Sequence, residues 1–443
     1  MKAGFVSLGC SKNLVDTEMM LGILREHGIE LTPEPAEADI LIVNTCAFIE
    51  SAKEESITTI LNMAEYKESG RCRSLIVAGC LGQRYGQELL DDMPEADAII
   101  GTGAWNRIME AVEESLKGHR VVIAGEDKLL YDEHTPRITT TPAYTAYVKI
   151  AEGCNNRCAF CAIPYIRGAY RSRPIEDIRD EVVNLAARGV KEIILIAQDT
   201  TEYGRDLYRE PQLAKLLRTL CTVEGVHWIR TLYSYPTYFS DELIETIASE
   251  PKLVKYVDLP MQHAHDEVLR RMHRPDTQAS MRALIEKLRT RIPGVTIRST
   301  FIVGFPGETE EEFQELCEFV KETEFDDVGV FTYSQEDGTP AALMDDQIPE
   351  EVKEERYHQL MAIQAKVSEI RNQELEGSVH TMLVEKVEEE KGIRQAVGRI
   401  EIQAPDVDGL TYLEDAQGVQ PGDMIPVRIA QGFAYDLVAE RID

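Results

Sequence analysis

Six of the nine cysteines fall into two groups whose positions suit iron–sulfur chemistry. The first group places three thiols within eight residues, at Cys154, Cys158 and Cys161. A cubane 4Fe-4S cluster normally takes four Cys ligands, so a set of three leaves one iron open to a substrate or cofactor. The alternative, a structural zinc site, needs a fourth Cys or His nearby, and none occurs between Tyr147 and Arg188. The spacing therefore favours a catalytic cluster.

The second group consists of cysteines that each follow a short apolar run, so that three predicted strands end near a thiol. The runs are residues 5–8, 40–43 and 75–78, and the thiols are Cys10, Cys46 and Cys80. The carboxyl ends of parallel strands share one edge of a sheet, where ligands bind in open α/β folds. Any one of these cysteines alone would more often be a small buried apolar residue, but the repetition favours a second three-thiolate site. Cys72 precedes its strand and is predicted to be a surface thiol.

Two sheets are needed to position these two groups, and a chain of 443 residues is long enough for two or three domains. We expect an α/β protein in three parts. Residues 1–116 are predicted to form an open α/β domain, residues 140–372 a partial (β/α)6 barrel, and residues 373–441 a small antiparallel β-barrel. Residues 116–143 contain Gly, Pro and a Thr run and are predicted to be a linker.

The central part alternates strand-like and helix-like patterns six times, which is typical of a β/α barrel. Its predicted strands are residues 147–150, 193–197, 228–232, 256–259, 296–303 and 327–332, and its helices include 175–188, 241–248, 278–291, 310–322 and 349–375. The triple-Cys loop follows the first of these strands, at the carboxyl face where such barrels carry their chemistry. Strands of the terminal barrel are predicted at 381–385, 410–413, 424–429 and 434–438.

Further candidate site residues follow other strands of the predicted barrel. A Gly/Pro turn is predicted to form part of a cofactor pocket, since glycine allows close backbone approach; it comprises Gly304, Phe305, Pro306, Gly307 and Glu308. Thr309 is the predicted N-cap of the helix after this turn. Gln198 and Asp199 follow the second strand and His263 follows the fourth, so all three are catalytic candidates. A structural role for His263 is an equal alternative.

Charge and composition limit the partners that the chain can have. It carries 78 acidic and 47 basic residues, a formal net charge of −31, which is a poor match to a protein whose main partner is nucleic acid. An acidic surface would attract a basic partner, or serve solubility alone. Arg167, Arg171 and Arg173 form a basic cluster that could bind a carboxylate or phosphate, or simply be solvated.

The sequence also indicates a compartment. No apolar run reaches the roughly 18 residues of a membrane helix. The first ten residues lack the apolar core and the cleavage site of a signal peptide. We therefore expect a cytoplasmic protein, in which cysteines remain thiols or metal ligands.

Together these motifs resemble the radical S-adenosylmethionine (SAM) methylthiotransferases over nearly the whole chain. The resemblance lies in the Cys-x3-Cys-x2-Cys loop with Phe160 before its last Cys, the cluster domain before it and a TRAM-like domain after it. It implies two 4Fe-4S clusters. The auxiliary cluster would be ligated by Cys10, Cys46 and Cys80, and the SAM-binding cluster by Cys154, Cys158 and Cys161. It also implies a SAM pocket at residues 304–308, use of two SAM and a sulfur donor, and an electron donor such as a flavodoxin or ferredoxin.

Two branches of this family compete: one modifies an adenosine of tRNA, and the other modifies the β-carbon of an aspartate in the twelfth protein of the small ribosomal subunit. The opening at residues 8–13, Leu-Gly-Cys-Ser-Lys-Asn, resembles the second branch, where the tRNA type has Gly-Cys-Gln-Met-Asn. Residues 196–200, Ile-Ala-Gln-Asp-Thr, also resemble the second branch, where the tRNA type has Gly-Gln-Asn.

The charge of the terminal domain points the same way. From residue 373 onward the chain has 15 acidic and 6 basic residues, a net charge of −9. This suits a basic ribosomal protein better than RNA, so tRNA is not an expected partner. Glu401, Asp406 and Asp408 are predicted to lie on this acidic surface. A protein of a different functional class, an iron–sulfur electron carrier or scaffold, is an alternative interpretation. It explains the cysteines but not the barrel, the Gly/Pro turn or the terminal domain.

Overall fold

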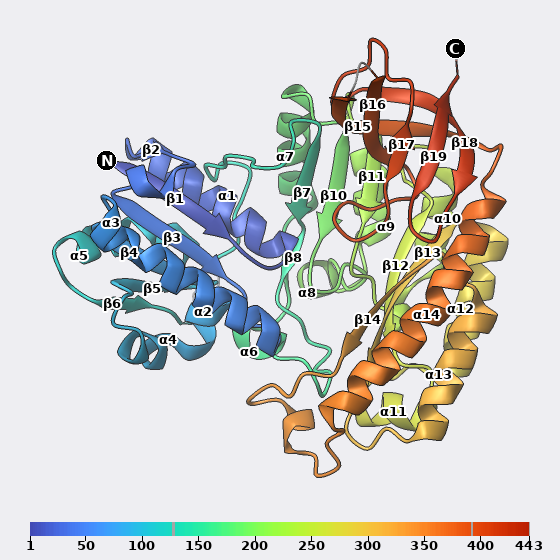
Figure 1. Cartoon of the computed structure of the whole chain (residues 1–443), viewed down its shortest axis with the longest axis horizontal. Helices are drawn as coiled ribbons and strands as arrows, with labels where there is room; N and C mark the ends of the chain where they lie inside the picture. The colour runs from blue at the N-terminus through green and yellow to red at the C-terminus, as the bar shows by residue number, and fades with distance from the viewer. Residues whose placement is uncertain (126–128, 391–392, 443) are drawn as a thin grey trace.

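The computed structural model describes residues 1–125, 129–390 and 393–442, which form three successive parts (Figure 1). In the first part, parallel strands form one sheet in the order β2-β1-β3-β4-β5-β6. The strands are β1 (Lys2–Ser7), β2 (Glu30–Leu31), β3 (Ile40–Thr45), β4 (Ser74–Gly79), β5 (Ala98–Gly101) and β6 (Val121–Ile123). The helices are α1 (Ser11–Glu26), α2 (Glu50–Ala64), α3 (Tyr66–Ser69), α4 (Cys80–Asp92) and α5 (Ile108–Leu116).

Alternate residues of these strands face opposite helical layers, as a parallel sheet buried on both faces requires. Ile40 and Ile42 pack with α1 and α5, whereas Leu41 and Val43 pack with α2 and α4. The strands predicted at 5–8, 40–43 and 75–78 are present as β1, β3 and β4. The prediction for Cys72 is wrong: it is buried, because the chain after α3 turns inward and bonds back to that helix.

The stretch 116–143 does more than link two domains. β6 pairs with β5 as an outer strand of the sheet, and Arg137 forms an ion pair with the buried Glu18 of α1 at 2.6 Å. The Glu18 carboxylate also accepts a hydrogen bond from the Thr140 N–H at 2.5 Å. These tertiary contacts dock the segment onto the first part, and a turn-rich composition could not reveal them. The domain boundaries of the sequence analysis stay a prediction.

The central part is a partial barrel of parallel strands in two sheets, β7-β10-β11 and β12-β13-β14. Its strands are β7 (Thr145–Lys149), β10 (Glu192–Ile196), β11 (Trp228–Thr231), β12 (Tyr256–Gln262), β13 (Thr296–Val303) and β14 (Asp327–Thr332), with a small hairpin of β8 (Ala151–Glu152) and β9 (Arg171–Ser172). All six predicted strands are therefore present. Only an isolated bridge between Ile229 and Leu253 is described near the junction of β11 and β12.

Helices cover the outer face of this barrel and leave its carboxyl edge turned toward the first part (Figure 1). They are α6 (Ile163–Ile166), α7 (Ile175–Ala187), α8 (Arg205–Tyr208), α9 (Leu213–Cys221), α10 (Asp241–Ser249), α11 (Asp266–Arg271), α12 (Gln278–Arg291), α13 (Glu310–Thr323) and α14 (Glu350–Glu374). Thr309 caps α13 as predicted: its hydroxyl accepts from the Glu312 N–H, and Glu312 bonds back to the Thr309 N–H. No helix in the described part of the chain is both long and apolar enough to cross a membrane.

The third part is a closed barrel in the order β15-β16-β17-β19-β18. Its strands are β15 (Val379–Glu390), β16 (Ile393–Ile400), β17 (Thr411–Leu413), β18 (Met424–Gly432) and β19 (Leu437–Arg441). The pairs are antiparallel except β17 with β19, which run parallel. β16 lies outside every strand predicted from the sequence.

Ion pairs fasten this small barrel to the central one. The prediction that Asp408 lies on the acidic surface is wrong: its side chain is 1% exposed and pairs with Arg298 at 3.2 Å. Asp408 also accepts a hydrogen bond from the Tyr256 hydroxyl at 2.7 Å. Nearby, Arg399 pairs with the fully buried Glu192 at 2.7 Å. Part of the negative charge counted from the sequence is therefore neutralised inside this junction.

Candidate functional site

The three cysteines of the first part, the N-terminal triad (Cys10, Cys46 and Cys80), converge at the carboxyl edge of the sheet as predicted from the strand pattern. Gly9 has φ +81°, and a Cβ there would lie 2.8 Å from the Cβ of Cys46, so only glycine fits between the first two loops. Asn13 joins all three loops: its Nδ2 donates to the carbonyls of Leu8 (3.1 Å) and Thr45 (2.7 Å), and its Oδ1 lies 3.6 Å from the Cys80 sulfur.

The thiols of this triad differ in their readiness to ionise. Cys10 is exposed at the edge of the sheet. Partial loss of water around its sulfur disfavours the thiolate, but Lys12, Arg167 and backbone N–H groups outweigh that effect and lower the pKa of Cys10. Burial raises the pKa of Cys46, and it raises the pKa of Cys80 to about 12 despite the nearby Arg167. A metal ligand must be a thiolate, so binding at Cys46 and Cys80 would release protons.

The second set of thiols, the barrel triad (Cys154, Cys158 and Cys161), lies on the loop after β8. The Cys154 N–H donates to Gly168 and the Cys161 N–H to Cys158, each at 3.1 Å, and these bonds fold the loop on itself. Burial, with smaller contributions from the nearby Asp199 and Cys158, raises the pKa of Cys154 to about 12. Burial also raises the pKa of Cys161.

Both triads present three thiols, the donor set that a site-open cubane cluster needs. Within the described residues, no three His, Cys, Asp or Glu side chains stand close enough to hold a single metal ion. The sulfurs that bind a cubane each contact a different iron, so they stand further apart than ligands that share one ion. The ligand assignment of both triads stays a prediction.

Two of the catalytic candidates support the barrel triad. Asp199 is buried; its carboxylate accepts from the Asn156 amide at 2.8 Å and from the Thr201 hydroxyl at 2.6 Å, which anchors the cysteine loop to the end of β10. Burial raises the pKa of Asp199. Gln198 donates to Glu152 at 2.9 Å, while its own carbonyl oxygen is buried with no hydrogen-bond partner among the described residues. Gln198 therefore has an acceptor left for a ligand.

The third candidate, His263, is fully buried beneath the Gly/Pro turn. Its Nδ1 accepts from the His265 N–H at 3.0 Å, and its Nε2 lies 3.5 Å from Glu308. Glu308 is itself buried, accepts from the Gly304 N–H at 3.0 Å, and pairs with Arg356 at 2.7 Å. These contacts favour the structural alternative for His263.

Glycine is required at position 304 because the turn packs closely against α14. It has φ +73°, and a Cβ there would lie 2.3 Å from the Lys353 side chain on α14. Gly307 also has a positive φ, but its Cβ position is open except for contacts at 3.8 Å or more. The turn is thus held from behind by Glu308 and α14. Its part in a SAM pocket stays a prediction.

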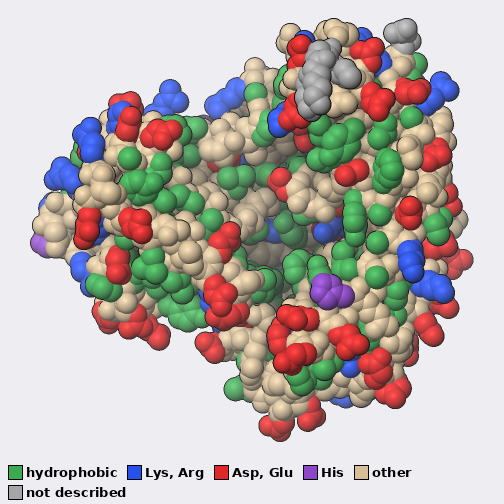
Figure 2. Space-filling model, in the orientation of Figure 1, with side chains coloured by type: hydrophobic (Ala, Val, Ile, Leu, Met, Phe, Trp, Pro, Cys, Tyr) green, Lys and Arg blue, Asp and Glu red, His purple; other side chains and the backbone are tan. Residues whose placement is uncertain are grey.

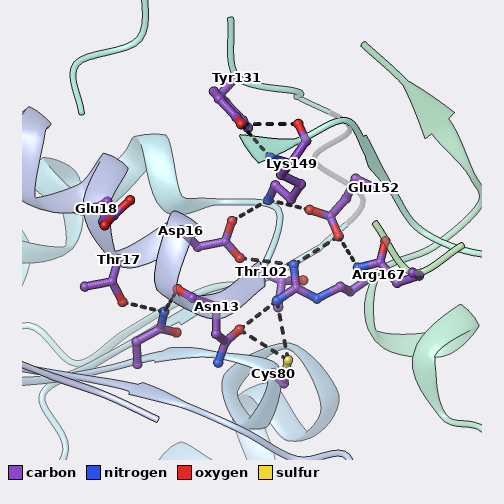
Figure 3. Close-up of polar contacts among 12 residues, drawn as sticks. Asn13, Asp16, Thr17, Glu18, Cys80, Thr102, Tyr131, Lys149, Glu152 and Arg167 are labelled. Carbon is purple, nitrogen blue, oxygen red and sulfur yellow. Dashed lines mark hydrogen bonds and ion pairs between the residues drawn. The ribbon is translucent and has the colours of Figure 1, made fainter. Parts of the chain in front are cut away.

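A buried network of charged side chains joins Cys80 of the N-terminal triad to Lys149 and Glu152 at the start of the barrel (Figure 3). Arg167, 1% exposed, donates to Asp16 of α1 and to Glu152 of β8, both at 3.0 Å, and its Nη2 lies 3.7 Å from the sulfur of Cys80. Lys149 of β7 bridges the same two carboxylates, at 2.5 and 2.6 Å. Burial disfavours the charged form of Glu152, but Arg167 and Lys149 outweigh it and lower the pKa of that carboxyl.

Sequence reasoning missed most of this network, although a signal was present. Lys149 and Glu152 interrupt an otherwise apolar run, and charged residues inside a buried strand must be paired. Of the predicted basic cluster, Arg167 belongs to the network, and Arg173 is fully buried against Asp177 and Glu181. Neither is free to bind a phosphate. In Figure 2 the surface is hollowed between the first part and the barrel.

The arrangement of a cluster domain, a partial barrel and a closed five-stranded barrel defines a class, and the comparisons agree with it. Residues 148–320 match the radical SAM superfamily, residues 2–101 match the uncharacterized protein family UPF0004, and residues 377–442 match the TRAM domain. The chain is a radical SAM protein.

Relatives with full-length similarity narrow the class further. The "Ribosomal protein uS12 methylthiotransferase RimO" of Desulforamulus reducens is 54% identical, over 99% of this chain and 98% of its own. The protein of the same name from Geobacter sulfurreducens is 50% identical, over 100% and 98%. The chain belongs to the RimO family of radical SAM methylthiotransferases. The resemblance stated from the opening motif is confirmed, as is the choice of branch.

Solved structures support the fold alone. The radical SAM methyltransferase TsrM of Kitasatospora setae, solved with cobalamin and a 4Fe-4S cluster, matches with a TM-score of 0.57 at 14% identity and covers 77% of each chain. OxsB, a cobalamin-dependent SAM radical enzyme, matches with a TM-score of 0.51 at 12% identity, over 82% of this chain and 56% of its own.

Proposed function

We propose that this chain adds a methylthio group to the β-carbon of an aspartate in ribosomal protein uS12, using two SAM and a sulfur donor. The observation that carries the proposal is the domain junction at which Arg167 contacts Cys80 of one thiol triad and pairs with Glu152, two residues before Cys154 of the other. The β-carbon hydrogen of an aspartate is too weakly acidic for a side-chain base at neutral pH, so radical chemistry is required.

The residues present fit two clusters with separate tasks. The barrel triad would hold the cluster that binds SAM, and the N-terminal triad would hold the auxiliary cluster. When bound, these clusters supply the electron that cleaves SAM and the place that carries sulfur. The protein's own residues fix geometry: Asn13 ties the three N-terminal loops together, Asp199 holds the barrel loop, and Arg167 sets one against the other.

The terminal barrel provides an acidic face for a basic protein. Its exposed carboxylates include Glu388, Glu389, Asp406, Glu414, Asp415 and Glu440. Exposed charges of this kind accelerate association with an oppositely charged partner and are screened by salt. A flavodoxin- or ferredoxin-type electron donor completes the proposal, which places the enzyme in the cytoplasm with the ribosomal protein.

The test supplies the reconstituted protein with SAM, reductant, sulfide and either uS12 or tRNA. We expect uS12 to gain the mass of one methylthio group on an aspartate and tRNA to remain unmodified. A variant with Ala at all three positions of the N-terminal triad should still cleave SAM but give no product. An electron carrier or scaffold would cleave no SAM, and modification of tRNA instead of uS12 would refute the substrate.

A further inference from the structure

Lys12 is a buried cation at the domain junction. It lies in the first turn of α1, two residues after Cys10, and is 6% exposed. In the part of the chain that the structure describes, no carboxylate stands within ion-pair distance of its ammonium. The two neighbouring cations of the junction differ: Lys149 and Arg167 each bind both Asp16 and Glu152. A buried charge normally has a partner, so an unpaired one indicates that a ligand supplies it.

The contact that Lys12 does make comes from the other domain. Its Nζ lies 2.8 Å from the centre of the Tyr233 ring, just beyond the carboxyl end of β11. Tyr233 has φ +64°, a left-handed conformation that costs a bulky residue energy. Two hydrogen bonds hold it there: its N–H donates to Asp258 at 2.8 Å, and its carbonyl accepts from the Thr200 N–H at 3.0 Å. The barrel thus holds Tyr233 in a strained backbone conformation that places its aromatic ring against the Lys12 ammonium.

This arrangement suits a carboxylate. An aromatic face holds an ammonium by cation–π attraction without neutralising its charge, and an ammonium has three N–H donors. The ring can cover only one side, so donors remain for an anion that enters between the first part and the barrel, where the surface is hollowed (Figure 2). Lys12 lies two residues after Cys10 of the predicted sulfur-delivering triad.

We propose that Lys12 binds the side-chain carboxylate of the target aspartate, so that the neighbouring β-carbon is held between the two triads. This inference rests on the proposed function and names the group that recognises the substrate. SAM also carries a carboxylate, but its predicted place is the barrel triad, whereas Lys12 lies in α1, two residues after Cys10 of the N-terminal triad. Tyr233 acts as a positioning residue that keeps the ammonium on the barrel side.

The test compares Lys12→Met, which keeps the side-chain length without the charge, with Lys12→Arg, which keeps the charge. Lys67→Met serves as the control, because Lys67 pairs with Asp97 at the opposite, amino edge of the sheet. Each reconstituted protein is titrated with uS12 in the absence of reductant and then assayed for KM, kcat and SAM cleavage. The same measurements use uS12 with its target Asp replaced by Asn.

We expect Lys12→Met to weaken binding of uS12 and raise KM by about 10- to 100-fold, the usual effect of losing a charge-assisted hydrogen bond. Iron content and SAM cleavage should stay unchanged, Lys12→Arg should restore most of the affinity, and Lys67→Met should match the parent. The parent should prefer Asp over Asn at the target position, and Lys12→Met should lose that preference.

Three results would overturn the inference. The first is unchanged uS12 binding and KM in Lys12→Met. The second is an equal loss of affinity for the Asp and Asn forms of uS12 in that variant, which would indicate a structural role for Lys12. Loss of SAM cleavage with intact uS12 binding would assign the ammonium to the carboxylate of SAM. If the parent protein does not modify uS12 at all, the proposed function itself fails, and that outcome is separate from the other three.

Discussion

Replacing Arg167 by Met should uncouple the N-terminal sheet from the barrel. One guanidinium satisfies four acceptors from both domains: Asp16 and Glu152 at 3.0 Å, Asn13 at 2.6 Å, and the sulfur of Cys80 at 3.7 Å. Met fills a similar length but donates nothing. Lys149 would then be left alone to neutralise two buried carboxylates.

The magnitude follows from that imbalance. Removing one partner of a buried ion pair costs about 3–5 kcal/mol, because the remaining charge stays buried without compensation. This is a large share of the roughly 5–15 kcal/mol that stabilises a typical domain. Arg167→Lys should recover only part of it, since one ammonium cannot reproduce the planar fork that reaches Asp16, Glu152 and Asn13 together.

Calorimetry of the iron-free protein is the suitable assay, because loss of a cluster then cannot contribute. We expect Arg167→Met to lower the midpoint of the N-terminal unfolding transition and to separate it from that of the barrel. The double variant Asp16→Asn, Arg167→Met restores neutrality, with Lys149 facing Glu152 alone. It should be destabilised by less than the sum of the two single variants, by about 2 kcal/mol or more of coupling. Additive losses, or an unchanged midpoint in Arg167→Met, would refute the reasoning.

Other consequences can be tested in the same way. Ala at all three positions of the barrel triad should halve the iron bound after reconstitution and abolish SAM cleavage, whereas Cys72→Ala should leave iron content unchanged. Arg356→Met leaves the buried Glu308 beneath the Gly/Pro turn without its ion-pair partner, so the free energy of unfolding should fall by about 3 kcal/mol. The same variant should bind SAM more weakly in equilibrium dialysis. Burial opposes ionisation of Glu192, but Arg399 and Arg230 outweigh it and lower the pKa of that carboxyl. The contribution of the Glu192 carboxylate to stability is therefore fully present above its ordinary pKa of about 4.3 and is lost as the pH falls below that value. In thermal unfolding measured from pH 7 to 3, the parent should lose stability more steeply toward acid than the Glu192→Gln variant does.

The parts of the fold with strong local patterns could be predicted from the sequence. Short strand-like runs predicted the three strands that precede the N-terminal triad and all six barrel strands, because consecutive side chains of a buried strand are mostly apolar. β16 follows a run of charged residues at 388–391 and lacks such a run of its own, so pairing with β15 decides it. Short outer strands such as β6 depend on the sheet already being there.

Site residues were predictable where chemistry constrains the residue type, and less so where geometry does. Cysteine spacing indicates a metal without knowledge of the fold. Asp408 illustrates the reverse case. Its sequence context, an acidic domain, predicts an exposed charge, but its side chain is buried between the terminal and central barrels, where it contacts Arg298 and Tyr256. A net charge counts residues but does not locate them. The pairing of charges between segments 150 residues apart, as for Asp16 and Arg167, follows only from the tertiary structure.

The polar character of the junction has a physical reason. Two apolar surfaces can slide over each other at small cost, because the hydrophobic effect is non-directional. If both triads act on one carbon atom, as proposed, they need a fixed separation, and a planar guanidinium with acceptors from both domains accepts only one register. In the same network Lys149 and Arg167 both pair with Asp16 and Glu152, and no carboxylate among the described residues stands within ion-pair distance of Lys12. A junction built for rigidity is then also a junction in which the remaining ammonium is available to an incoming carboxylate.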